Sequence, residues 1–160
     1  MSNDANSDGA AAARVALVTG ATRGIGQAIA DALAGAGLTV VGTATTEGGA
    51  ATIDERLAPQ GGAGLRLDVA DGDSIAGVLA EISERFGAPT VLVNNAGITR
   101  DNILLRMKEA EWQDVLDTNL TSVYRLSRAL LRGMTKARWG RIINITSVVG
   151  SMGNAGQSNY

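Results

Sequence analysis

Short runs of β-branched and aliphatic residues alternate along this chain with longer segments of helical periodicity. The apolar runs occupy residues 14–19, 38–42, 64–68, 89–93 and 138–146. Apolar residues at helical spacing fill the intervals, at residues 25–36, 47–58, 71–86 and 109–136. Unbroken apolar strands that alternate with helices indicate a parallel sheet covered by helices on both faces. The sequence therefore predicts an α/β fold built on a Rossmann-type, doubly wound parallel sheet.

The length of the chain fits one domain, because 160 residues bury a sizeable core and no linker or internal repeat divides them. Residues 1–13 are small and polar, so we expect a flexible tail before a domain at 14–160. This tail lacks the basic start and apolar run of a signal peptide, and no apolar run reaches membrane-spanning length. We therefore expect a cytoplasmic protein with no membrane partner.

The composition excludes several kinds of chemistry. A net charge of −2 and a sequence pI of about 5.1 give no general attraction to nucleic acid. The chain has no Cys and no His, so disulfides, thiolate metal sites and the commonest metal ligand are missing. We expect no metal site, and any acid-base chemistry falls to Tyr, Lys, Asp or Glu.

A glycine-rich turn joins the first predicted strand to the first predicted helix. Gly20, Gly24 and Gly26 lie within the stretch Thr19-Gly-Ala-Thr-Arg-Gly-Ile-Gly26. Glycines at a strand-to-helix junction let the backbone approach a diphosphate, and the helix start offers N–H groups to it. The turn therefore predicts a dinucleotide site; the alternative is a tight turn without a ligand.

The end of the second predicted strand bears on which dinucleotide would bind. An acidic residue there binds the ribose 2′-hydroxyl of NAD, whereas a basic residue nearby accommodates the 2′-phosphate of NADP. Residues 42–46 contain no carboxylate, Thr45 offers a hydroxyl, and Arg23 lies in the glycine turn. The pattern favours NADPH, with a solvated surface charge as the alternative role of Arg23.

Two further strand ends carry polar residues whose roles the sequence leaves open. Asp68 and Val69 follow the third strand, where the carboxylate and a backbone group could meet adenine. The alternative for Asp68 is a helix N-cap ahead of Asp71. The stretch 94–97 (Asn-Asn-Ala-Gly) follows the fourth strand and is, taken alone, a common turn sequence.

Taken together, these motifs closely resemble the short-chain dehydrogenases and reductases. The resemblance runs from about Arg14 to Tyr160 and includes the glycine turn, the Asn-Asn-Ala-Gly stretch, Asn119, Ser147 and Tyr160. Within that family, residues 95–102 and 147–160 are similar to the 3-oxoacyl-[acyl-carrier-protein] reductases of bacterial fatty-acid synthesis. The cofactor-binding positions that the resemblance implies are Gly20, Thr22, Arg23, Gly24, Ile25, Gly26, Thr45, Asp68, Val69, Asn95, Ala96 and Gly97.

The resemblance also implies a reaction and partners. Ser147 would hold the substrate carbonyl oxygen, Tyr160 would protonate it, and the hydride would come from NADPH. Asn119 would kink the long helix and anchor a water in the proton relay; its alternative is an ordinary polar residue inside a helix. The substrate would be a 3-oxoacyl thioester on acyl carrier protein, and residues 109–136 would build a homotetramer.

One departure from the family pattern is large. The family has a lysine four positions after the tyrosine, which lowers its pKa, and the sequence stops at Tyr160. The last strands of the family's sheet and its substrate lid are also missing, so we expect little or no turnover. The alternatives are a non-catalytic nucleotide-binding or assembly fragment, or a related enzyme such as acetoacetyl-CoA reductase. Arg138 and Arg141 could meet an acidic carrier protein or be ordinary surface charges.

Overall fold

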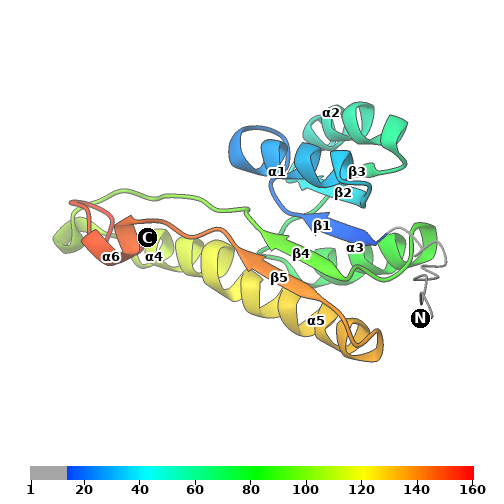
Figure 1. Cartoon of the computed structure of the whole chain (residues 1–160). Helices are drawn as coiled ribbons and strands as arrows, with labels where there is room; N and C mark the ends of the chain where they lie inside the picture. The colour runs from blue at the N-terminus through cyan, green and yellow to red at the C-terminus, as the bar shows by residue number, and fades with distance from the viewer. Residues whose placement is uncertain (1–13) are drawn as a thin grey trace, which may run out of the picture.

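A computed structural model describes residues 14–160; the tail predicted at residues 1–13 lies outside the described residues. Five parallel strands form one sheet in the order β3-β2-β1-β4-β5, with helices on both faces (Figure 1). Strands β2 and β3 lie on one side of β1, and strands β4 and β5 lie on the other side. The predicted doubly wound α/β architecture is confirmed, and its topological switch point lies between β1 and β4.

The elements lie close to the predicted segments. The strands are Val15–Val18 (β1), Thr39–Ala44 (β2), Ala63–Arg66 (β3), Val91–Asn94 (β4) and Arg141–Asn144 (β5). The α-helices are Gly24–Gly35 (α1), Glu47–Leu57 (α2), Gly72–Arg85 (α3), Glu109–Leu116 (α4), Ser122–Lys136 (α5) and Val149–Met152 (α6). Shorter turns are the 3-10 segments Ala58–Gln60 (η1) and Leu104–Arg106 (η2) and the π-helical Asp117–Thr121 (η3).

Alternate residues of each inner strand enter two separate cores. In β1, Val15 and Leu17 join a cluster that α3 and α5 complete, whereas Ala16 and Val18 join one that α1 and α2 complete. Because both faces of β1 are buried, all four of its residues are apolar. Among residues 14–160, no helix combines the length and the hydropathy needed to cross a membrane.

The segment predicted as one helix over residues 109–136 is divided. The α-helical hydrogen bonding of α4 gives way to the π turn η3 before α5 begins. Asn119 lies in the middle of this turn. A π turn interrupts the helical repeat without ending the helix, which is why apolar periodicity alone did not reveal it. The short helix α6, four residues long, was also not predicted.

The strand β5 lies at one edge of the sheet and is much less covered than its neighbours. All four residues of β4 are buried, whereas those of β5 are exposed, with Ile142 at 39% and Ile143 at 43%. Only β4 pairs with β5 in the described part of the chain. This edge matters because Ser147 follows β5 directly.

Candidate active site

The glycine turn between β1 and α1 requires glycine for two separate reasons. Gly20 and Gly24 have positive φ angles of 67° and 60°, which residues other than glycine rarely adopt. Gly26 is required by close approach, because a Cβ there would lie 2.2 Å from the Gly20 carbonyl oxygen. Helix α1 therefore begins almost in contact with the end of β1.

Side chains from two strands hold this turn in place. The Asn95 Nδ2 donates to the carbonyl oxygens of Thr19 and Gly20, at 2.9 and 3.0 Å. The Thr19 hydroxyl oxygen accepts from the backbone amides of Asn95 and Ala96, each at 3.0 Å. The ends of β1 and β4 are therefore cross-linked, and both Nδ2 protons of Asn95 are used inside the protein.

The amino end of α1 fits a diphosphate group. Its N-cap residue, Arg23, is extended and exposed, and its side chain makes no capping hydrogen bond. Apart from its chain neighbours and the backbone of its own helix, no atom of residues 14–160 lies within 4 Å of the position that a Cβ at Gly24 would take, so this face of the turn is open. Uncapped helix N–H groups beside an open glycine backbone are the donor set that phosphate oxygens need.

The end of β2 carries the Thr45 hydroxyl, which the sequence associated with NADP, and a cation that the sequence did not single out. Thr45 is exposed there, and a Cβ at Gly49 would lie within 3.4 Å of the Thr22 hydroxyl, so Thr22 lies beside the start of α2. Sequence reasoning missed Arg66, whose Nε donates to the Thr45 carbonyl at 3.2 Å and lies 3.9 Å from Glu47. The sequence feature that could have identified Arg66 is a basic residue at the end of β3, the strand that pairs with β2.

The carboxyl end of β3 leads into a turn that carries Asp68 and Val69. The Asp68 carboxylate accepts from the Ala70 amide at 2.9 Å, and its residue is exposed. The N-cap of α3 is Asp71, which accepts from the Asp73 amide, so Asp68 is not the helix cap. The Val69 side chain is in the core, which leaves its backbone for any ligand contact.

A cleft of about 530 Å³ opens at the carboxyl ends of β4 and β5, next to the switch point. It brings together seven of the residues that the sequence predicted: Ile25, Asn95, Ala96, Gly97, Asn119, Ser147 and Tyr160. The other predicted residues lie outside its lining, on the glycine turn and at the ends of β2 and β3. No lysine or arginine is among the lining residues in the described part of the chain.

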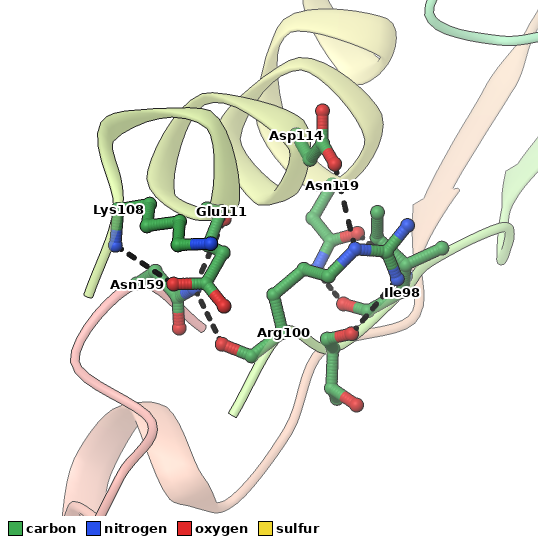
Figure 2. A network of polar contacts seen from close by, with 8 residues as sticks. Ile98, Arg100, Lys108, Glu111, Asp114, Asn119 and Asn159 are labelled. Atoms are coloured by element: carbon green, nitrogen blue, oxygen red, sulfur yellow. Dashed lines mark hydrogen bonds and ion pairs between the residues drawn. The ribbon is translucent and has the colours of Figure 1, made fainter. Parts of the chain in front are cut away.

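Asn119 fastens one wall of this cleft. Its Oδ1 accepts from the Ile98 amide at 2.8 Å and its Nδ2 donates to the Ile98 carbonyl at 2.9 Å (Figure 2). A Cβ at Gly97 would lie 3.3 Å from the same Oδ1. The π turn thus presents Asn119 to the backbone that follows β4, and its side chain is committed there.

Ser147 and Tyr160 line the same cleft from the segment that follows β5. The β5 end is joined to β4 by a hydrogen bond of 2.8 Å between the side chains of Asn94 and Asn144. The Ser147 hydroxyl oxygen accepts from the Val149 amide at 3.2 Å, which orients it at the start of α6. Tyr160 lines the cleft as well and is 41% exposed, so part of the residue remains accessible to solvent.

A polar network borders the cleft beside α4 (Figure 2). The Glu111 carboxylate accepts from the Lys108 amide at 2.7 Å and from the Asn102 side chain at 3.1 Å. These two hydrogen bonds, that of the Lys108 amide first, hold the pKa of Glu111 below its ordinary value of 4.5. Arg100 and Asp114 form an ion pair of 3.4 Å in the same network.

The two arginines near β5 are not part of this site. Arg141 begins β5, and its guanidinium lies 4.9 Å from the centre of the Trp139 ring. Arg14 stacks on the same ring at 4.1 Å. Arg138 precedes them in a left-handed conformation, with φ of 52°. The guanidinium groups of Arg14 and Arg141 therefore contact Trp139 at the amino end of β5, the end opposite Ser147.

Comparison with known proteins agrees with this geometry. The short chain dehydrogenase family matches residues 14–160. The 3-oxoacyl-[acyl-carrier-protein] reductase FabG of Pseudomonas aeruginosa is 64% identical over 149 residues, and that of Escherichia coli is 58% identical over 147. Each match covers 92% of this chain and 60% of the relative, so the chain spans about three fifths of those proteins. The chain belongs to the short-chain dehydrogenase family of oxidoreductases.

Proposed function

We propose that this chain carries the cofactor site and part of the catalytic site of an NADPH-dependent 3-oxoacyl thioester reductase of fatty-acid synthesis. The observation that carries the proposal is one cleft lined by Ser147, Tyr160 and Asn119 beside a glycine turn suited to a diphosphate. Similarity to FabG proteins over 92% of the chain supports the choice of substrate class.

The cofactor roles follow the order of the strand ends. Gly20, Gly24, Ile25 and Gly26 would bind the diphosphate through the glycine turn and the start of α1. The adenosine 2′-phosphate would meet Thr22, Arg23 and Thr45, and Arg66 adds a second cation beside Thr45. Asp68 and the Val69 backbone would contact adenine, and residues 95–97 would border the nicotinamide half.

The chemistry of the cleft is a carbonyl reduction with two hydrogen-bonding partners. NADPH, when bound, supplies the hydride that reduces the carbonyl carbon of the substrate. The Ser147 hydroxyl donates a hydrogen bond to the carbonyl oxygen, and the Tyr160 hydroxyl gives that oxygen its proton, which yields the 3-hydroxyacyl thioester. Asn119 has its side chain engaged by Ile98, so its backbone carbonyl is the group left to hold a relay water.

We also propose that acyl carrier protein presents the substrate, that α4 and α5 build a homotetramer, and that the protein is cytoplasmic. A CoA thioester is an alternative substrate within the same chemistry. A non-catalytic nucleotide-binding fragment is the second candidate, favoured by the open glycine turn and uncapped start of α1, which fit a diphosphate without Ser147 or Tyr160.

The test separates binding from turnover. We expect residues 1–160 to enhance the fluorescence of NADPH on titration but not to oxidise it with an acetoacetyl thioester. By the family resemblance, the lysine four positions after the tyrosine tunes that tyrosine for proton transfer, and this position lies outside residues 1–160. A chain lengthened with the remaining part of a FabG relative should oxidise NADPH. A folded chain that binds no NADPH would contradict the cofactor site, and a lengthened chain that binds without turnover would favour the second candidate.

A further inference from the structure

The segment that carries Tyr160 is tied to the loop after β4. We call residues 153–160 the Tyr160 segment and residues 98–103 the post-β4 loop. The Asn102 amide donates to the Gly156 carbonyl at 2.8 Å, and the Gln157 side chain donates to Asp101 at 3.0 Å. Asn102 and Gln157 also form an isolated parallel bridge. Segments far apart in sequence therefore run side by side at this border of the cleft.

Asn159 makes the most buried of these ties. Its residue is only 6% exposed, whereas the contact of Gln157 with Asp101 is exposed. Its Nδ2 donates to two carbonyl oxygens, that of Arg100 at 2.9 Å and that of Glu111 at 3.1 Å (Figure 2). Its Oδ1 is buried and has no hydrogen-bond partner among residues 14–160. Burying the unpaired Oδ1 of Asn159 costs free energy. The compensating stabilisation comes from the two segments that its Nδ2 joins.

The two carbonyls belong to elements that the cleft needs. Arg100 lies in the post-β4 loop, which Asn119 fastens two residues earlier through the backbone of Ile98. Glu111 lies in α4, whose continuation is the π turn that presents Asn119. Asn159 thus contacts the same loop and the same helical unit as Asn119, and it is joined to Tyr160 by one peptide bond.

We propose that Asn159 is a positioning residue, which fixes the Tyr160 ring in the cleft relative to Asn119. It is absent from the residues that line the cleft, so it acts through its neighbour rather than on a ligand. The inference rests on the proposed function, because the place of the Tyr160 hydroxyl matters only where that hydroxyl protonates a substrate.

The experiment uses NMR on the 160-residue chain with ring-¹³C tyrosine and uniform ¹⁵N labelling. The chain has two tyrosines, so a Tyr124→Phe variant assigns the signal of Tyr160, and Tyr124 serves as an internal reference. Asn159→Asp keeps the size of the side chain and removes both donors. The matched control is Asn154→Asp in the same segment, where an exposed side chain donates a hydrogen bond to the Gln157 side chain.

We expect Asn159→Asp to move the Tyr160 ring signal toward that of free tyrosine and leave Tyr124 in place. Amide exchange in residues 100–102 and 156–160 should become about tenfold faster, as loss of two buried hydrogen bonds implies. Asn154→Asp should change neither. NADPH binding should be kept within about twofold, because the glycine turn makes no contact with Asn159. A Tyr160 signal and loop exchange that match the wild-type chain in Asn159→Asp would overturn the proposal.

A measurement on the wild-type chain covers the case in which Asn159→Asp does not fold. The two Nδ2 protons of Asn159, each held by a carbonyl, should exchange slowly with solvent; rapid exchange would overturn the proposal. Failure of the proposed function gives a different result. A folded chain would then bind no NADPH, while the NMR signals of Asn159 and Tyr160 would still show whether the Tyr160 segment is held to the post-β4 loop.

Discussion

Replacing Gly26 by alanine tests whether the glycine turn depends on close backbone approach. The added Cβ would lie 2.2 Å from the Gly20 carbonyl oxygen and 2.4 Å from the Asn95 Nδ2, well inside the closest normal approach of 3.0 Å. Overpacking of this kind costs about 2 kcal/mol. The displaced Asn95 side chain would lose hydrogen bonds to Thr19 and Gly20, about 1 kcal/mol each. The better helix propensity of alanine returns about 1 kcal/mol, so we expect a net loss of about 3 kcal/mol.

Gly35→Ala is the matched control in the same helix. No atom lies within 4 Å of the Cβ that it would add, so alanine should stabilise the chain by up to about 1 kcal/mol. Urea unfolding followed by circular dichroism gives both free energies. If Gly26→Ala proved as stable as the wild-type chain, the turn would have room for a side chain, and the argument for a glycine cradle would fail. A folded Gly26→Ala chain should also bind NADPH more weakly, since the turn that receives the diphosphate has moved.

Two further outcomes are expected. Arg66→Gln should weaken NADPH binding about fivefold and leave NADH binding unchanged, because a charged hydrogen bond to an exposed phosphate is lost. The control is Arg85→Gln on the remote helix α3. If Arg66→Gln weakened the binding of both cofactors equally, the role of Arg66 at the 2′-phosphate would be refuted. Glu111→Gln should lower the urea midpoint at neutral pH but have little effect in acid. Because the pKa of Glu111 is lowered in the folded chain, its carboxylate stabilises the fold above pH 4.5. This stabilisation is lost as the pH falls through the pKa that Glu111 has in the folded chain. A pH-independent difference between Glu111→Gln and the wild-type chain would contradict this assignment.

The inner part of the fold could be predicted because local pattern and tertiary environment agree there. Strand β1 is apolar at every position since both of its faces are buried, and the stripe of Ile75, Val78 and Ile82 in α3 faces the core as its spacing predicted. Gly37 follows α1 with a φ of 87°, as expected of a residue that ends a helix. Each of these signals is contained within a few neighbouring residues.

The parts that escaped prediction depend on contacts between distant segments. The apolar spacing of residues 109–136 is compatible with an unbroken helix; the family resemblance alone predicts a kink at Asn119, and neither signal reveals the hydrogen bonds of Asn119 to the Ile98 backbone. Arg66 becomes relevant because β3 pairs with β2, which brings it to Thr45. Asn159 looks like an ordinary loop residue in the sequence, since both of its partners are backbone carbonyls, which no side-chain pattern can encode.

The two walls of the cleft differ in how firmly the fold supports them. Asn95, in one wall, and the glycine turn beside the cleft follow β4 and β1, whose residues are all buried, so opening this side requires breaking the core. Ser147 follows β5, an edge strand with exposed isoleucines, and Tyr160 is held mainly through the polar ties of its own segment. Regions with few buried apolar contacts open at lower free energy than the core. The cofactor half should therefore remain assembled when the Ser147 and Tyr160 half opens, which is the physical reason to expect nucleotide binding and turnover to be separable in this chain.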